Sequence, residues 1–230
     1  MIDIQKMVES KINSLWGKHS DLDLCKYPAN CTKEIPESGI VFIGLNPSMS
    51  AKEKVRLEAR IDKEDKACEF PLLTGDPNSD HQYFKKFYDI GKKTKMAWGH
   101  LDILYCRETS QKNIEILLGH EQGHDFIASQ CHITKTILEQ IINENNPRIF
   151  VVVNTLSRKL ICGKVQGEYH SAGINFDFEW NETLGTYTYK NNPFFFSSML
   201  TGQRALDNGS FERLVWHINQ VKSKLKTFTS

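Results

Sequence analysis

The sequence lacks the features that would attach it to a membrane or direct it out of the cell. No apolar run approaches the ~20 residues of a membrane span, and residues 1–6 lack the apolar core of a signal peptide. An excess of charge is also missing, since 29 Lys and Arg stand against 28 Asp and Glu. We therefore expect a cytoplasmic protein with no membrane partner, in which any site for a polyanion such as DNA is a local patch.

Cysteine is too sparse and too dispersed to form a disulfide framework. Six cysteines are spread over 230 residues, and in a reducing compartment they are expected to be thiols or metal ligands. With 40% hydrophobic residues, the chain is long enough for one sizeable core and short for two full-size domains. We expect a single domain over residues 1–230, and a monomer.

The apolar spacing predicts helices that alternate with strands. The continuous β-branched run at 149–153 is typical of a strand covered on both faces in a parallel sheet. The fold class predicted is α/β, a three-layer α/β/α sandwich with a mostly parallel central sheet of about four strands. Strands are expected at 40–45, 101–105, 149–153 and 194–196, a hairpin at 173–190, and helices at 4–16, 81–90, 125–145, 155–162 and 211–225. The charged stretch 52–66 is expected to be either an exposed helix or a mobile segment.

The first strand runs into a loop with the sequence Gly44-Leu45-Asn46-Pro47-Ser48. Glycine permits the close approach of a backbone or ligand, and proline holds the preceding asparagine in an extended conformation. The amide of Asn46 can both donate and accept hydrogen bonds. Because open α/β sheets bind ligands at the carboxyl ends of their strands, this segment is predicted to be an active-site loop. An ordinary tight turn is the alternative interpretation.

Three further loops should lie at the same edge of the sheet as this one. They follow the other predicted strands and cover residues 102–108, 154–158 and 197–204. The carboxyl ends of parallel strands meet at one edge, so the polar residues of these loops are candidates for one shared site.

The order of these parts resembles the uracil-DNA glycosylase superfamily. The likeness is closest to the mismatch-specific and single-strand-selective branches, whose first motif is a strand followed by Gly-x-Asn-Pro-Gly. In that family a Phe-containing loop comes next, then a strand with a base-reading polar residue, a helix leading into a Val-rich strand, and a final His-Pro-Ser-x-Leu or Asn-Pro-Ser-x-Leu motif. The counterparts here are Phe70-Pro71, Asp102, residues 125–153 and the segment Phe196-Ser197-Ser198-Met199-Leu200.

The resemblance implies a DNA glycosylase-like hydrolase of base-excision repair. Such an enzyme flips a damaged or deaminated base out of single- or double-stranded DNA and hydrolyses its N-glycosidic bond. The roles implied are catalysis for Asn46 and Ser198, base binding for Gly44, Leu45, Phe70 and Asp102, and DNA binding for Ser48, Arg158, Leu200 and Arg204. Tyr83 or Phe84 is the alternative to Phe70 as the ring that stacks on the base. The alternative interpretations are a turn amide, core aromatic residues, a core leucine and solvated arginines.

Two departures from the family pattern bear on the substrate and on catalysis. The uracil-specific branches read the base with an asparagine, whereas an ionised Asp102 only accepts hydrogen bonds. It suits an exocyclic amino group, or uracil if the carboxyl is protonated. The final motif has Phe196 or Ser197 in place of its histidine or asparagine, and loss of such a donor typically costs ~10²–10³ in rate. A non-catalytic nucleic-acid-binding protein of the same fold is therefore the alternative function.

A third function is suggested by His120-Glu121-Gln122-Gly123-His124, which matches the zinc-binding pattern His-Glu-x-x-His. A zinc-dependent hydrolase needs a third ligand. The extended form of the motif fails because residue 130 is Gln, which leaves Glu139 or Glu144 as a distant carboxylate.

Four cysteines match the order of ligands in iron–sulfur branches of the superfamily. Cys25 and Cys31 precede the first motif, and Cys106 and Cys131 follow the second strand. Thiolates are the ligands that such a cluster requires, but both pairs are spaced more widely than in those branches. We expect inert thiols and no cofactor, with the cluster as the alternative.

Overall fold

The computed structural model describes residues 1–19, 22, 28–49, 51–61, 73–144, 146, 148–162, 167–202 and 205–228. Four residues named above lie outside these ranges, namely Cys25, Phe70, Pro71 and Arg204.

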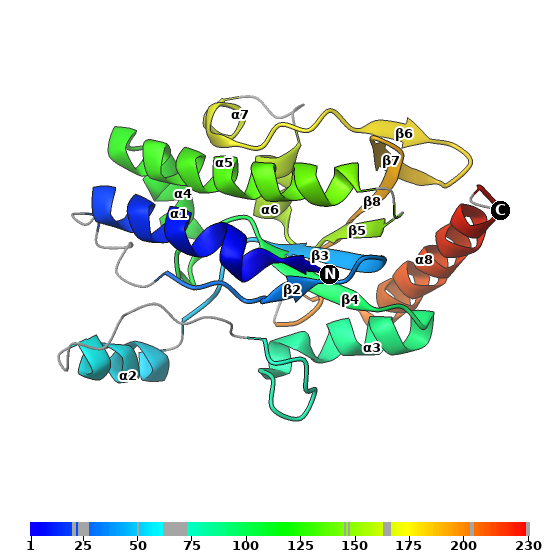
Figure 1. Ribbon diagram of the computed structural model, residues 1–230, viewed down its shortest axis with the longest axis horizontal. Coiled ribbons are helices and arrows are strands. Elements are labelled where there is room, and N and C mark those ends of the chain that lie inside the picture. Colours follow the sequence, from blue (N-terminus) through cyan, green and yellow to red (C-terminus); the bar gives the residue numbers. More distant parts are fainter. Residues whose placement is uncertain are drawn as a thin grey trace.

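A six-stranded, mostly parallel sheet forms the centre of the molecule (Figure 1). In spatial order its strands are β4 (Trp98–Asp102), β3 (Gly39–Gly44), β5 (Arg148–Val152), β8 (Asn192–Phe196), β7 (Thr186–Tyr189) and β6 (Glu179–Asn181). The first four are parallel, and they correspond to the four strands predicted from the sequence. The expected count of about four strands was wrong because the hairpin β6–β7 pairs antiparallel with β8 and extends the sheet.

Helices cover both faces of the sheet (Figure 1). One face carries α1 (Ile4–Lys18), α4 (Gln111–Leu118), α5 (Glu121–Asn143), α6 (Thr155–Ile161) and α7 (Glu168–Ala172). The other face carries the 3₁₀ turn η2 (Gln82–Phe84), α3 (Lys85–Thr94) and α8 (Asn208–Phe228). The helix α2 (Ala51–Ile61) lies apart from both cores, and β1 (Ile2–Asp3) pairs with β2 (Glu34–Ile35) in a small second sheet.

Alternation along β3 explains the two cores. Val41 and Ile43 belong to the core under α1 and α5, whereas Ile40 and Phe42 belong to the core under α3 and α8. Side chains of a strand point alternately to opposite faces, so a strand that is apolar at every position must be covered on both sides. This is the three-layer arrangement predicted from the sequence. Within the described ranges, no helix is long and apolar enough to cross a membrane.

The second parallel strand differs most from its prediction. β4 covers residues 98–102 instead of 101–105, since the chain leaves the sheet after Asp102. Tyr105 then accepts a hydrogen bond from the Ala29 amide, and the Gln130 side chain of α5 accepts from the amides of Tyr105 and Cys106. Residues 103–106 therefore lie outside the strands of the sheet and are held by these tertiary contacts.

The helix predicted at 81–90 does not end at residue 90, before a glycine that could have closed it. It continues to Thr94 and is closed by Lys95, whose φ is 51°. Gly91 lies inside the helix and serves packing. A Cβ at Gly91 would lie 2.6 Å from Cδ1 of Trp98, so only glycine lets β4 approach the helix this closely.

Candidate functional site

The loops that follow β3 and β4 form one unit at the carboxyl edge of the parallel strands. The amides of Ile103 and Leu104 donate to the carbonyls of Gly44 and Leu45 at 3.1 and 2.8 Å. Farther along, the Glu108 amide donates to the Pro47 carbonyl at 3.2 Å. The two segments, 44–48 and 102–108, are thus brought together as the sequence predicted.

Asn46 connects these loops through its side chain. Its Nδ2 donates to the carbonyls of Cys106 at 2.9 Å, Glu108 at 2.6 Å and Pro47 at 3.2 Å. The remaining polar atom of the amide is Oδ1, which can only accept. In this orientation Asn46 can offer an acceptor to a ligand or water while its nitrogen fixes the shape of the loops.

Asp102 lies in a buried polar cluster with His100 and Cys31. His100 and Asp102 alternate along β4 and therefore share the face that α3 covers. The Cys31 thiol donates to Oδ2 of Asp102 at 3.1 Å, and Nε2 of His100 lies 3.8 Å from Oδ1. The exposed fractions are only 6% for Asp102, 1% for His100 and 6% for Cys31. These three groups face one another rather than bulk solvent.

Cys31 reaches this cluster because residues 28–32 run beside the end of β4. Pro28 forms a bridge with Cys106, and the Ala29 amide donates to the Tyr105 carbonyl at 2.9 Å. On the other side, the Leu73 amide donates to the Cys31 carbonyl at 2.8 Å. The thiol is therefore fixed between two backbone segments that are distant in sequence.

Gly44 leaves the space that the cluster occupies. A Cβ on this residue would lie 2.3 Å from Oδ1 of Asp102 and 2.9 Å from Nε2 of His100. Such distances are shorter than van der Waals contact, so a larger residue would displace the cluster. The close approach predicted for Gly44 is thus present, and it involves side chains of the neighbouring strand.

Aromatic rings surround the imidazole of His100. The ring centroids of Tyr83, Phe84 and Phe87 lie 6.2, 5.3 and 5.5 Å from the imidazole, all in edge-to-face arrangements. Neither ring nitrogen of His100 has a hydrogen-bond partner among the described residues. The cluster therefore sits in a largely apolar environment.

Burial dominates the acid–base properties of the cluster. It raises the pKa of Asp102, against the opposing effects of His100 and of the Cys31 hydrogen bond. It also lowers the pKa of His100, and it raises that of Cys31 well above the usual value for a thiol, with the nearby carboxyl adding to the effect. Cys31 is consequently not an activated nucleophile. A raised pKa of Asp102 favours the protonated form that can donate a hydrogen bond.

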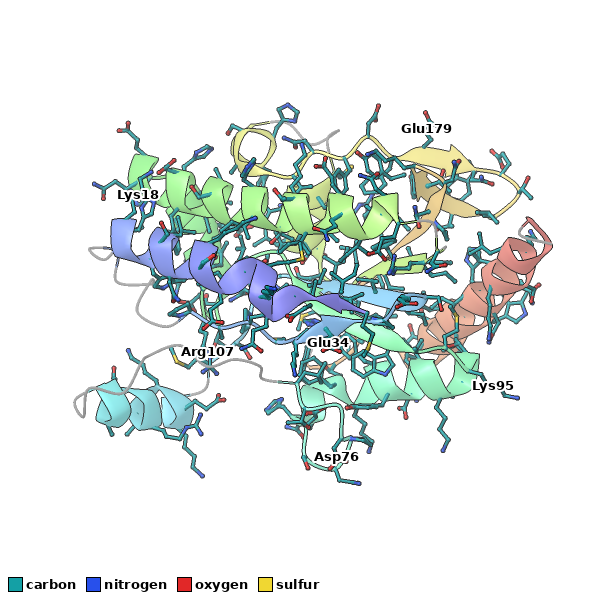
Figure 2. All side chains as sticks on the ribbon, in the orientation of Figure 1. Lys18, Glu34, Asp76, Lys95, Arg107 and Glu179 are labelled. Carbon is teal, nitrogen blue, oxygen red and sulfur yellow. The ribbon has the colours of Figure 1, made fainter. Side chains whose placement is uncertain are left out.

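Arg107 is a buried cation close to the same cluster, on the side of the sheet that faces α2 (Figure 2). Its Nη2 donates to the Ser48 carbonyl and to Oε1 of Glu53 in α2, both at 3.2 Å. The positive charge of Arg107 acts to lower the pKa of Cys31, although burial outweighs it. Sequence reasoning assigned no role to Arg107 because an arginine after a strand is more often solvated.

His100 was also missed, and Cys31 was considered only as a cluster ligand. The alternation His100-Leu101-Asp102 within a strand was the one signal that could have paired the imidazole with the carboxylate. No sequence pattern connects Cys31 with Asp102, which lies 71 positions away.

The final loop places its serines differently from expectation. Ser198, the expected catalytic donor, is exposed, whereas Oγ of Ser197 is buried and has no hydrogen-bond partner among the described residues. The Ser197 amide donates to the Val152 carbonyl at 2.8 Å, which holds this residue at the carboxyl edge of the sheet. Ser197 is the better placed of the two hydroxyls for an interior ligand.

Leu45 and Leu200 are core residues in the structure. Leu45 is 5% exposed in the core under α5, and Leu200 is 2% exposed in the core under α8. The Leu200 side chain therefore does not project towards DNA, and the alternative of a core leucine describes its position. Of the predicted DNA contacts, Ser48 and Arg158 are exposed, and the Arg158 guanidinium lies 5.5 Å from the centre of the Phe196 ring.

The His-Glu-x-x-His match does not assemble as a helical motif. His120 precedes α5 in an extended conformation with φ of −115°, so the two imidazoles are not successive positions on one helix face. Nε2 of His124 instead lies 2.7 Å from Oγ of Ser171. Gly123 serves packing, since a Cβ there would lie 2.3 Å from the Leu117 carbonyl oxygen of α4.

Of the four cysteines considered as iron–sulfur ligands, the three that the structure describes do not form one ligand cluster. Cys106 and Cys131 influence each other electrostatically, but Cys31 is hydrogen-bonded to Asp102. The part of the chain that the structure describes holds one group of three side chains suited to a metal ion, and it is Cys31, His100 and Asp102.

Comparison of the chain with models of protein families, with curated proteins and with solved structures finds no match. The fold and the site define an α/β protein with a six-stranded, mostly parallel sheet and a polar cluster at its carboxyl edge.

Proposed function

We propose that this protein is a uracil-DNA-glycosylase-like hydrolase that binds DNA, flips a base into the carboxyl edge of the sheet and hydrolyses its N-glycosidic bond. The observation that carries the proposal is the connection between Asn46 and the loop that begins at Asp102. It puts the Gly44-Leu45-Asn46-Pro47 turn and the polar end of the next parallel strand in one rigid unit. This is where the resemblance expects a water-positioning amide and a base-reading residue.

Asp102 is the base-reading group in this proposal. Its ionised form accepts hydrogen bonds and suits the exocyclic amino group of a cytosine or adenine derivative. Its protonated form donates to a carbonyl, as uracil or hypoxanthine requires, and burial of the carboxyl favours that form. The state of the carboxyl therefore selects between two classes of base.

Asn46 positions the water that attacks the sugar in this proposal. With its nitrogen committed to three backbone carbonyls, its oxygen can accept a hydrogen bond from a water and orient that water towards the sugar carbon. The water oxygen bonds to this carbon while the bond from the carbon to the base nitrogen breaks. The electron pair leaves with the base, and the proton that the water loses ends on the base. Where the family has a histidine or asparagine that donates to the departing base, this chain offers the neutral hydroxyl of Ser197. Because that hydroxyl is a weaker donor, we expect a slow enzyme.

The test is base release from single- and double-stranded oligonucleotides that carry uracil, hypoxanthine, xanthine or an alkylated base. Asn46→Ala removes both the oxygen that orients the water and the nitrogen that holds the loops, so release should fall at least ~10²-fold. Asn143→Ala, at an exposed position near the opposite edge of the sheet, is the matched control and should retain wild-type release.

Two other outcomes are informative. Salt-dependent binding of DNA without release, at enzyme in excess over oligonucleotide, would replace the hydrolase with the non-catalytic binding protein. If the protein neither releases a base nor binds DNA, the proposal is refuted altogether.

A further inference from the structure

We propose that Cys31, His100 and Asp102 form a binding site for one Zn²⁺ ion, with the fourth coordination position left to a water or a ligand. The inference does not depend on the glycosylase proposal, since it rests on the cluster alone.

The ligand atoms of the three residues lie near one another. Zinc–ligand bonds of 2.0–2.3 Å place neighbouring ligand atoms about 3.3–3.8 Å apart. Here Sγ of Cys31 lies 3.1 Å from one carboxylate oxygen of Asp102, and Nε2 of His100 lies 3.8 Å from the other. The ligand atoms of all three residues lie within 4.8 Å of one another, so small side-chain rotations suffice to bind one ion.

The unsatisfied imidazole is an independent indication of a ligand. His100 is 1% exposed, and neither nitrogen has a hydrogen-bond partner among the described residues. A buried polar group in that state destabilises the folded protein. A metal bond to Nε2 would satisfy one of the two nitrogens and explain why a histidine occupies a site lined by Tyr83, Phe84 and Phe87.

Gly44 supplies the room in which two of the proposed ligands lie together. A Cβ at this position would occupy the space beside Oδ1 of Asp102 and Nε2 of His100, at 2.3 and 2.9 Å. Both atoms are candidate ligands of the ion. The glycine therefore lets the Asp102 carboxylate and the His100 imidazole lie side by side against the backbone of β3.

The ligand types select the metal. A thiolate and an imidazole favour Zn²⁺ and related transition metals over Mg²⁺ and Ca²⁺, which prefer oxygen ligands. Three protein ligands with one open position are the pattern of zinc sites that bind a further group. On binding, the Cys31 thiol gives up its proton to solvent and becomes a thiolate ligand.

The site has a consequence for the proposed function. When the ion is bound, one carboxylate oxygen of Asp102 binds the metal, and only the other oxygen can form a hydrogen bond with a base. Metal content and base release are separate measurements, so failure of one proposal is distinguishable from failure of the other.

The experiment is a metal titration of the full chain. Protein stripped with a chelator is equilibrated with Zn²⁺, desalted and analysed by mass spectrometry for bound metal, and a parallel sample is loaded with Co²⁺. We expect about one Zn²⁺ per chain, and a near-ultraviolet thiolate-to-cobalt charge-transfer band that reports the Cys31 ligand.

Three variants make the test specific. Cys31→Ser and His100→Gln should each lower zinc affinity at least ~10-fold, and Cys31→Ser should abolish the cobalt band. Cys131→Ser, a change of an equally buried thiol outside the cluster, should keep both signals. Circular dichroism establishes which variants are folded.

The proposal is overturned if folded wild-type protein retains no zinc. It is also overturned if zinc is retained equally by Cys31→Ser and His100→Gln, because the ion would then bind elsewhere in the chain.

Discussion

Gly44 and Asp102 are register partners at the ends of β3 and β4, and a Cβ on Gly44 would come within 2.3 Å of the Asp102 carboxylate. Gly44→Ala should therefore destabilise the protein by about 1–3 kcal/mol, as overpacking of a dense site does. The free energy of unfolding in urea measures the effect. Gly17→Ala is the control, because nothing lies within 4 Å of the added carbon near the end of α1, and it should stabilise by about 0.5–1 kcal/mol.

Asp102→Asn should change which base is released. Asparagine both donates to a carbonyl and accepts from an N–H, as uracil requires, while an ionised carboxylate only accepts. We expect release of uracil to rise at least ~10-fold relative to release of bases with an exocyclic amino group. Competition assays on oligonucleotides that carry both kinds of base measure the ratio. An unchanged ratio would show that Asp102 does not read the base.

Ser197→Ala should lower activity without lowering stability. The buried hydroxyl has no partner among the described residues, so its removal costs no hydrogen bond in the folded protein and leaves the free energy of unfolding unchanged or higher. If this hydroxyl donates to the departing base, release should fall ~10²-fold. Ser198→Ala, at an exposed position, should have little effect on either quantity. Equal effects of the two variants on release would contradict the assignment.

Arg148 should be essential for stability and irrelevant to the site. Its fully buried guanidinium donates to the Pro36 carbonyl at 3.1 Å, the Ile141 carbonyl at 2.8 Å and the Glu144 carboxylate at 2.6 Å. Arg148→Ala leaves these acceptors without the donor and should cost about 3–5 kcal/mol in urea unfolding. Because β5 begins at Arg148, the residue lies at the opposite edge of the sheet, and zinc binding by the folded fraction should be unaffected.

Asp80 should make stability depend on acid pH. Partial burial opposes ionisation, but hydrogen bonds from Tyr88, Thr74 and Gly75 outweigh it and lower the pKa of this carboxyl. Its stabilising effect is therefore complete above the unfolded pKa of about 4 and is lost as the pH falls through the lower folded value.

The measurement compares wild type with Asp80→Asn by thermal unfolding between neutral and strongly acidic pH. The variant should be less stable at neutral pH, and the two curves should converge in acid. Tyr88→Phe removes one donor and should reproduce part of the effect. A difference that stays constant with pH would show that ionisation of Asp80 does not stabilise the fold.

The sequence alone determined the parallel part of the sheet and the position of the loops. Buried strands such as residues 149–153 are apolar at every position, and this pattern is local. The close approach at Gly44 and the hydrogen-bonding capacity of Asn46 were also predicted from local chemistry, since glycine has no side chain and an amide both donates and accepts. The hairpin was predicted as well, but its pairing with β8 was not, because pairing with an edge strand depends on a distant partner.

Only the tertiary structure brought together the cluster of Cys31, His100 and Asp102. Cys31 lies in an irregular segment whose position is set by hydrogen bonds to residues 73 and 105, and neither contact leaves a periodic signal in the sequence. Burial likewise decided that Leu200 is a core residue and that Ser197, rather than Ser198, carries the interior hydroxyl. Local patterns specify which face of an element is apolar, but which side chains meet across elements depends on the packing of the whole chain.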